Sequence, residues 1–289
     1  MDVKPATTYL QQVEILRSRG LQVENETFAL STLQRINYYR LTGYTLTVRD
    51  ACTEQFREGI TFRHVARLYD FDQRLRHVLS GVLESIEVAF RDRVAYVLAH
   101  QVGPLGYMDS RNFKNAEYHA AFIRDLDDEI AKSQEIFVQH HIENYGGQLP
   151  VWVAIEVLSF GVMSLLYKNM KDTEQIAVGT YYNTKEPYLS TWVHAAVRLR
   201  NICAHYGRLY GRTLSPIVKL YKWQTVGLTV GSLAPNLMAL KGVCPDPNEW
   251  TTFVNSVKTL VEEYEDVVEL EHLGLSDGWF RRLVAARPK

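Results

Sequence analysis

The sequence predicts an all-α fold, and three observations support this. Apolar residues recur at three- and four-residue steps through the long patterned stretches, which is the spacing of one face of an α-helix. Residues that favour helix starts, such as Thr61, Pro150 and Pro187, stand before these stretches. With 289 residues, 46% of them hydrophobic, the chain can bury a substantial core. We therefore expect a helical bundle.

Two short helices are expected near the N-terminus. The pattern over residues 9–19 predicts a helix that stops at Gly20, and a second helix begins near Asn25. Residues 45–48 have the sequence TLTV, which could form a short extended piece.

The segment 36–44, with the sequence INYYRLTGY, combines aromatic and basic residues. The arginines in and around it are Arg35, Arg40 and Arg49. Aromatic rings beside guanidinium groups could stack on nucleic acid bases. Aromatic residues also dominate ordinary cores and interfaces, and this structural role is the commoner one.

A long helix is expected from an N-cap at Thr61 to about residue 101, ended by Gly103 and Pro104. Its apolar stripe should face the core. A different face carries Glu84, Glu87 and Arg91. Such a charged face is usually exposed to solvent. Alternatively, Glu87 and Arg91 reach a neighbouring helix and orient its polar groups.

Residues 117–143 carry many acidic side chains along a helical pattern, which is typical of an amphipathic outer helix. His140 and His141 stand near Glu143, a combination that could suggest a metal site. Adjacent residues on a helix point about 100° apart, so these histidines do not favour one.

A further helix should start at Pro150, and its apolar residues over 151–166 cover nearly its whole circumference. We expect this helix to be central and buried. Glu156 would then be a buried carboxylate that needs a basic partner, such as Arg91 or Arg200.

The region between Pro187 and Pro216 should hold one long helix or two collinear helices, packed against the Pro150 helix. One side of this region is apolar. The opposite side is a polar and basic stripe with steps of three or four residues: His194, Arg198, Asn201, His205, Arg208 and Arg212. Such a stripe suits phosphate or carboxylate groups.

Arg200 lies outside this stripe. Five residues separate it from His205, so on an ideal helix their Cα–Cβ vectors diverge by about 140°. The two converge only if the arginine swings towards the stripe, if Gly207 and Gly211 loosen the helix end, or if a second protomer completes the site. The last option implies a dimer.

Charge is distributed unevenly along the chain. The formal net charge is −1, yet no Asp or Glu occurs between Glu186 and Asp246. That interval contains Arg198, Arg200, Arg208, Arg212, Lys219, Lys222 and Lys241. We expect a local positive field there, balanced by acidic helices elsewhere.

The three cysteines show no CxxC spacing, and an odd number cannot all pair, which fits a reducing compartment. No zinc site, other metal or cofactor is predicted. The N-terminus lacks an apolar signal core, and the hydrophobic run 151–167 is too short to span a bilayer. We expect a cytoplasmic protein without a membrane partner.

Beyond Pro216 the pattern is less regular, and residues 226–230 could be a brief strand or a loop. A long helix is predicted over 247–271 and a short one after Ser276. Without repeats or a low-complexity linker, we expect residues 61–289 to form one helical domain. Residues 1–60 would be a helical appendage packed on it.

Four blocks carry a family resemblance. They are 36–44 (INYYRLTGY), 83–91 (LESIEVAFR), 150–161 (PVWVAIEVLSFG) and 199–212 (LRNICAHYGRLYGR). In this order they resemble the Abi_2 group of bacterial abortive-infection proteins, of the AbiD and AbiF type. The last block also looks like the R-N-x3-H form of the Rx4H motif of HEPN ribonucleases.

This resemblance implies an all-helical HEPN fold, a homodimer, and a metal-independent endoribonuclease that acts as a toxin in phage defence. Arg200 and His205 would be the catalytic pair, with Asn201 orienting them. From the residue pattern rather than the resemblance, we expect the stripe arginines Arg198, Arg208 and Arg212 to bind RNA and Glu87, Arg91 and Glu156 to support the site. In related systems a small RNA can be the antitoxin.

One departure from related toxins concerns a tyrosine. Toxins with an R-x4-H-x-Y motif carry it two places after the histidine, where this chain has Gly207. Tyr206 comes one place early. Regulation by modification of that tyrosine is therefore not implied here.

The expected chemistry uses the 2′-OH of RNA as nucleophile, so no metal is required. His205 would move protons, which histidine can do near neutral pH. Arg200 would stabilise the charged phosphorane. The products would be a 2′,3′-cyclic phosphate and a 5′-OH.

Two other interpretations are open. In the first, Arg200 pairs with a neighbouring helix and His205 is structural, so the protein binds RNA or acts as a scaffold without cleaving RNA. In the second, the chain is a helical module that only binds a protein partner. RNA binding by the basic stripe distinguishes the second from the others.

Overall fold

The computed structural model describes residues 5–285, and its regular structure is helical. Within that range no strand forms, and three isolated β-bridges are the only extended pairings. The predicted all-α class is confirmed. None of the helices in this range has the length and hydrophobicity that crossing a membrane requires.

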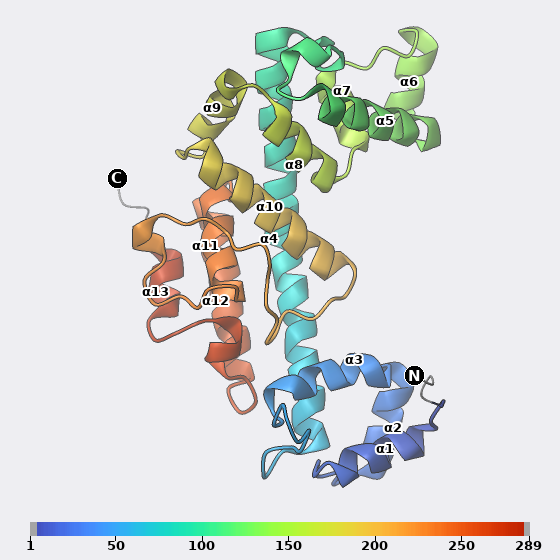
Figure 1. Ribbon diagram of the computed structural model, residues 1–289, viewed down its shortest axis with the longest axis vertical. Coiled ribbons are helices and arrows are strands. Elements are labelled where there is room, and N and C mark those ends of the chain that lie inside the picture. The colour runs from blue at the N-terminus through green and yellow to red at the C-terminus, as the bar shows by residue number, and fades with distance from the viewer. Residues whose placement is uncertain (1–4, 286–289) are drawn as a thin grey trace.

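One long helix, α4 (Phe62–Val102, 41 residues), forms the spine of the molecule (Figure 1). It begins as predicted, because the Thr61 hydroxyl accepts a hydrogen bond from the His64 N–H at 3.1 Å. It ends at Gly103, whose φ of 87° is a conformation that favours glycine. At about 1.5 Å per residue, α4 is roughly 60 Å long.

The N-terminal helices gather at one end of α4 (Figure 1). They are α1 (Tyr9–Ser18), α2 (Glu26–Arg35), α3 (Tyr38–Thr42) and the 3-10 helix η1 (Gly43–Thr47). The first two match the predicted helices. The extended piece at 45–48 is wrong, because the hydroxyls of Thr45 and Thr47 donate to carbonyls three residues earlier and stabilise a tight turn.

Near the other end of α4 lie α5 (Ala116–Lys132), α6 (Ile136–Asn144) and α7 (Val151–Ala154), of which α7 packs on α4 (Figure 1). Two short 3-10 turns, η2 (Gly106–Met108) and η3 (Ser110–Asn112), lead into them. The single helix predicted over 117–143 is interrupted between Lys132 and Ile136. There the Ser133 hydroxyl accepts from the Glu135 N–H at 3.2 Å, a local bond that competes with the helix.

The helix predicted from Pro150 is also broken, and it is not the central one. It divides into α7, the 3-10 helix η4 (Ile155–Val157) and α8 (Phe160–Asn169). The break follows from Ser159, whose hydroxyl accepts from the Val162 N–H at 3.3 Å and caps a new helix. Glu156 lies exposed on η4. The prediction that it is buried and paired is therefore wrong.

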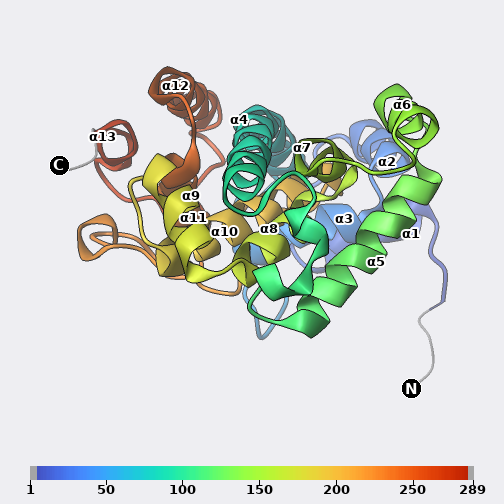
Figure 2. The same cartoon turned by 90° about the horizontal axis from the view of Figure 1, so that it is seen from above.

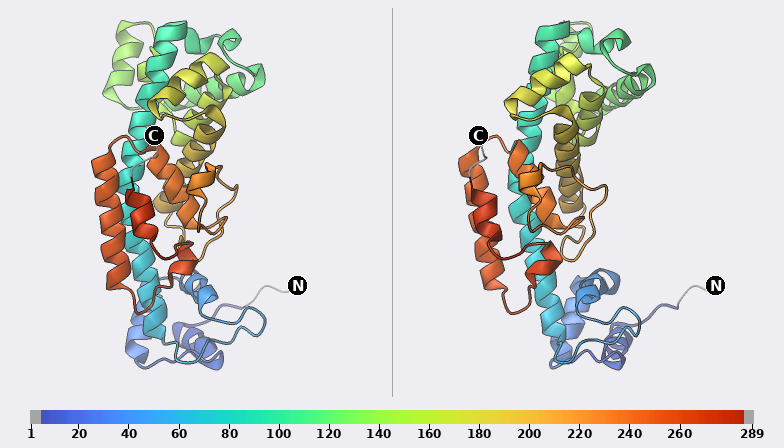
Figure 3. Two further views of the ribbon diagram at one scale, coloured as in Figure 1. Left: turned by 90° about the vertical axis from the view of Figure 1, so that its left-hand side faces the viewer. Right: turned by 60° about the vertical axis from the view of Figure 1, so that its left-hand side comes forward.

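The second half of the chain packs along α4. Its helices are α9 (Asp172–Tyr181), α10 (Glu186–Ala204), α11 (Leu233–Val243), α12 (Pro247–Glu263) and α13 (Trp279–Val284), with 3-10 turns η5 (Lys222–Gln224) and η6 (Leu270–Leu273). α10 crosses α4 and contacts α8, α9 and α11 as well (Figures 1 and 3). Seen from above, α12 and α13 lie on one side of α4, and α5 and α6 on the other (Figure 2).

The C-terminal expectations are met in part. α12 and α13 occupy the predicted stretches, although α12 ends at Glu263, and residues 226–230 form a loop. α11 was not predicted. Pro235 resembles a helix breaker in the sequence, but it lies in the first turn of α11, where its missing N–H costs nothing.

Candidate functional site

The last turn of α10 sets the geometry of the site. The Gly207 N–H donates to the Ile202 carbonyl at 2.7 Å and the Tyr206 N–H to the Cys203 carbonyl at 3.1 Å, while Tyr206 has a φ of 56°. These bonds form a Schellman motif, which ends a helix. The helix predicted to continue towards Pro216 therefore stops at Ala204, and the chain turns into a loop over 205–212.

A hollow of about 410 Å³ lies along α10 and this loop, and we call it the His205 hollow. Its lining residues are His194, Val197, Arg198, Asn201, Ile202, His205, Gly207 and Arg212. Five of the six residues in the predicted polar stripe are thus brought together, although the loop rather than a continuous helix places Arg212. Arg208 does not line the hollow.

The three stripe arginines differ in what they contact. Arg198 donates to the Pro216 carbonyl at 2.8 Å and to the Asn236 side chain at 2.5 Å, so two of its nitrogens already have protein partners. Arg208 is half-buried and donates to the Tyr210 carbonyl at 2.8 Å.

Arg212 is exposed, and its one side-chain hydrogen bond within residues 5–285 is a long one, 3.4 Å to the Arg208 carbonyl. Its guanidinium is the most available of the three for an anionic ligand. The neighbouring His194 adds little charge. Loss of hydration lowers its pKa, and the charges of Arg198 and Lys168 lower it further, so this imidazole is neutral at pH 7.

Arg200 is held from the opposite direction, by α4. Its Nε lies 3.3 Å from Oε2 of Glu87, and the other oxygen of that carboxylate is 2.6 Å from Nη2 of Arg91. Arg91 in turn donates to the Ile155 carbonyl at 2.6 Å. Glu87 therefore reaches α10, as one of the two alternatives predicted. Arg91 does not reach α10, because it contacts Glu87 and the Ile155 carbonyl on η4. Glu87, not Glu156, is the acidic partner of Arg200.

Asn201 lies between the two groups. Its side-chain oxygen accepts from Nη1 of Arg200 at 3.4 Å, and the residue also lines the His205 hollow. Arg200 does not line that hollow. Within a single chain, Arg200 and His205 therefore do not share a cavity. This agrees with the angular separation of about 140° expected for two residues five places apart on a helix.

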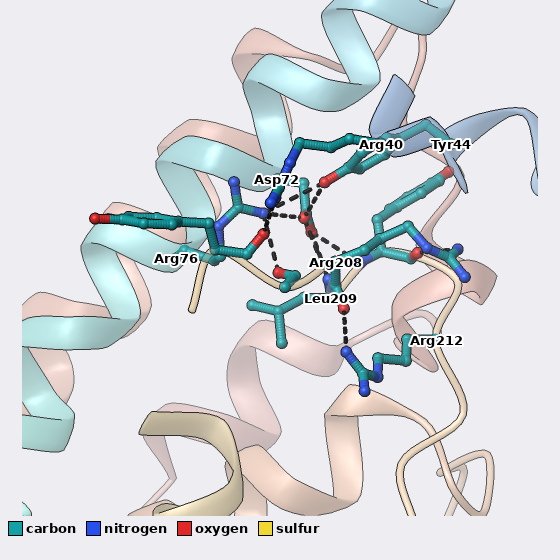
Figure 4. Close-up of polar contacts among 10 residues, drawn as sticks. Arg40, Tyr44, Asp72, Arg76, Arg208, Leu209 and Arg212 are labelled. Atoms are coloured by element: carbon teal, nitrogen blue, oxygen red, sulfur yellow. Dashed lines mark hydrogen bonds and ion pairs between the residues drawn. The ribbon is translucent and has the colours of Figure 1, made fainter. Parts of the chain in front are cut away.

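A buried cluster beneath the loop supports its shape (Figure 4). Asp72 on α4 is fully buried, and its carboxylate accepts from the Leu209 N–H at 3.1 Å and the Tyr210 N–H at 2.8 Å. The Tyr44 hydroxyl donates to the same carboxylate at 2.7 Å, and Arg76 forms an ion pair with it. Asp72 thus fixes the loop to α4.

Two arginines also bind the carbonyls where α10 ends. Arg76 donates to the Gly207 carbonyl at 3.2 Å, and Arg40 donates to the Tyr206 carbonyl (Figure 4). This cluster was not predicted from the sequence. Its signal was an oppositely charged pair four residues apart, Asp72 and Arg76, set among the apolar residues of α4.

Two groups near the loop could suggest other chemistry: the Cys203 thiol, and a cluster that includes His272, whose carbonyl accepts from the Gly211 N–H at 3.0 Å. Burial raises the pKa of Cys203 to about 12, so its thiol stays protonated and unreactive. Within residues 5–285, one group, formed by Glu269, Glu271 and His272, brings three possible ligand atoms together. The Glu269 carboxylate already pairs with Arg57 at 2.7 Å.

The comparisons with known proteins give one match. A family model, Abi_2, described as Abi-like protein, matches residues 31–211. The matched region runs from α2 to the loop after α10 and includes Glu87, Arg200 and His205. No curated protein and no solved structure matches the chain.

Proposed function

Since the chain belongs to the Abi-like protein family, whose model covers residues 31–211, we propose that it is a metal-independent endoribonuclease of the HEPN type. Family membership supports a role in abortive infection. The ribonuclease chemistry and the role as a toxin are our proposal. The observation that carries it is the end of α10, where Arg200 is held by Glu87 and His205 lies exposed beside Arg212.

His205 has the freedom that a proton-transfer group needs. Its side chain is exposed and makes no hydrogen bond to the rest of residues 5–285, so both ring nitrogens can reach a ligand. Histidine exchanges protons near neutral pH. In the proposed reaction it takes the proton of the RNA 2′-OH or gives one to the leaving 5′ oxygen.

Arg200 has a different role. Glu87 engages its Nε, and Nη1 makes one long hydrogen bond to Asn201, so N–H groups of both Nη atoms are left to donate to the non-bridging oxygens of a phosphate. The 2′ oxygen attacks phosphorus, the bond from phosphorus to the 5′ oxygen breaks, and the extra negative charge of the phosphorane falls beside the guanidinium. The products are a 2′,3′-cyclic phosphate and a 5′-OH.

We propose that the active form is a homodimer. The support is that Arg200 and His205 lie in different surroundings within one chain. A two-fold axis that passes near His205 would place the histidine of a second copy near the first, so that one acts as base and the other as acid. RNA, a second copy of the chain and a small RNA antitoxin are the proposed partners.

A test compares wild-type protein with His205→Ala and Arg200→Ala on single-stranded RNA, with EDTA present. Both variants should lose cleavage by at least about a hundredfold, the usual scale for a proton-transfer group. His205→Ala should keep nearly full RNA affinity. It should also no longer arrest the growth of bacteria that express it. If the His205→Ala protein cleaves RNA as fast as the wild type does, His205 is not catalytic and the proposal is wrong.

A second function, RNA binding without cleavage, is favoured by one observation. Arg200 is already paired with Glu87, as a structural arginine would be. In that case wild-type protein binds RNA through the His205 hollow but leaves it intact. The same assay separates the two functions.

A further inference from the structure

Tyr206 occupies a backbone position that normally belongs to glycine. In a Schellman motif the residue after the helix cap takes a left-handed conformation, and glycine is the usual choice because it has no Cβ. Here that residue is Tyr206, with a φ of 56°, and the glycine comes one place later. The sequence thus accepts backbone strain at this position.

Packing of the side chain does not explain this choice. Tyr206 is 67% exposed. Within residues 5–285 its ring has no aromatic or cation–π partner, and its hydroxyl makes no hydrogen bond. The strained backbone is held from outside, by Arg40 at the Tyr206 carbonyl and by Arg76 at the Gly207 carbonyl (Figure 4). A strained, exposed residue held by its surroundings is typical of a functional position.

A second hollow, of about 580 Å³, lies on the other side of Tyr206, and we call it the Arg40 hollow. It is formed by α2, the start of α3, α4 and the end of α10. Three arginines and a histidine line it, Arg35, Arg40, Arg76 and His77, and no carboxylate does. Asp72 lies beneath it and is already paired with Arg76. The Arg40 hollow therefore suits an anion.

Tyr206 stands between the two hollows. It lines the Arg40 hollow, while the preceding His205 lines the His205 hollow. Ala204 lines the Arg40 hollow too, and Arg200 lies four residues before it on the same face of α10. A nucleic acid strand, which has a phosphate at every nucleotide, could thus pass over the end of α10 from one hollow to the other.

We propose that Tyr206 is a stacking platform for one base of single-stranded RNA, and that the Arg40 hollow holds the adjacent phosphate. An exposed ring beside guanidinium groups is the combination that binds single strands with little sequence preference. This inference rests on the proposed function, since it places the same RNA. It also gives the N-terminal helices a part in binding, through Arg35 and Arg40.

The test measures the affinity for a short, fluorescently labelled single-stranded RNA by anisotropy. All variants carry His205→Ala, so the RNA stays intact. Tyr206→Gly removes the ring and fits the backbone conformation, and its dissociation constant should rise about tenfold or more, as expected for loss of one stacked base. Its melting temperature should be unchanged or higher. Tyr206→Phe, which restores the ring, should rescue the affinity.

A matched control is Tyr118→Ala. Tyr118 is 68% exposed, much as Tyr206 is, but it lies on α5 at the far end of α4 (Figure 1). Its loss should leave affinity unchanged. An RNA with an abasic site at the stacked position lacks the base that would stack. It should bind the parent protein about tenfold more weakly than intact RNA does. The Tyr206→Gly protein should bind the abasic and the intact RNA equally well. Arg35→Ala should reduce the slope of the logarithm of affinity against the logarithm of salt concentration by about one, as expected when one phosphate contact is lost.

Three results would overturn the inference. If Tyr206→Gly binds RNA as the parent does, the ring is not a stacking platform. That result would leave the proposed nuclease function standing. If Tyr206→Phe is as weak as Tyr206→Gly, the hydroxyl rather than the ring makes the contact. If the parent binds no RNA and wild-type protein cleaves none, the inference and the proposed function are both wrong.

Discussion

Glu87 is the acidic partner of Arg200. Its carboxylate bridges Arg91 and Arg200, and its side chain is only 12% exposed. Removing one partner of a buried pair leaves the other charge unpaired, at a cost on the order of 3 kcal/mol. The resulting loss of stability has to be separated from any effect on Arg200.

We predict that Glu87→Gln lowers both the unfolding free energy and the cleavage rate. The double variant Glu87→Gln with Arg91→Met should regain much of the stability, because the unpaired charge is removed, but not the rate, because Arg200 is still not held. Urea denaturation and single-turnover cleavage measure the two quantities. Full activity in the double variant would show that Glu87 is only structural.

We predict that substitutions of Arg212 and Arg208 affect different properties, RNA binding in the first case and stability in the second. Arg212 is exposed, so Arg212→Ala should weaken RNA binding and reduce its salt slope by about one, with little change in stability. Arg208 is half-buried, and burial lowers the pKa of its guanidinium. Arg208→Ala should instead lower the melting temperature. Salt titrations and thermal unfolding of both variants check this, and the reverse pattern would contradict it.

At the scale of elements, the break between α7 and α8 depends on a single cap. Ser159→Ala removes the hydroxyl that accepts from the Val162 N–H, which should cost about 1 kcal/mol in unfolding free energy. Glu156→Ala is the control, because that side chain is exposed and should have no effect. Equal stability of both variants and the wild type would mean that the cap does not stabilise α8.

The helices that could be predicted from the sequence are those with clear residue signals at their boundaries. α1, α2 and α4 begin at recognisable caps, so their presence was predictable, and α1 and α4 end at or near glycine, so their ends were predictable too. The break at Ser159 was missed because the surrounding apolar residues fit one continuous helix. α11 was missed because Pro235 looked like a stop.

The candidate site was predictable in its residues but not in its arrangement. Helical spacing placed His194, Asn201 and His205 on one side, as the structure has them. The end of α10 at Ala204 could not be predicted, because a tyrosine takes the place where glycine would have marked the stop. The position of Arg208 and Arg212 followed from that end.

At the scale of the whole molecule, α4 connects the parts of the site. It carries Glu87 and Arg91 for Arg200, and Asp72 and Arg76 for the loop after α10. Tyr44, from the N-terminal helices, joins the same buried cluster. The division into an appendage (1–60) and a main domain (61–289) stays a prediction, as does the cytoplasmic location. The contacts show that the N-terminal helices support the loop directly.

We predict a dimer whose sites are shared between copies. Arg200→Ala and His205→Ala proteins are each expected to be inactive. Mixing them under conditions that exchange subunits should restore a small fraction of the wild-type rate, because one site of the mixed dimer combines an intact Arg200 from one copy with an intact His205 from the other, while its second histidine is still missing. Light scattering gives the oligomeric state. A monomer that cleaves RNA at full rate would rule out the shared site.

The central claim is that the end of α10 cleaves RNA by attack of the substrate's own 2′-OH. The most direct measurement compares an RNA oligonucleotide with the same oligonucleotide carrying a 2′-deoxy nucleotide at the cleaved position, and identifies the product ends in the presence of EDTA. We predict cleavage of the first oligonucleotide alone, giving a 2′,3′-cyclic phosphate and a 5′-OH. Cleavage of the deoxy substrate, or products with a 5′ phosphate, would contradict it.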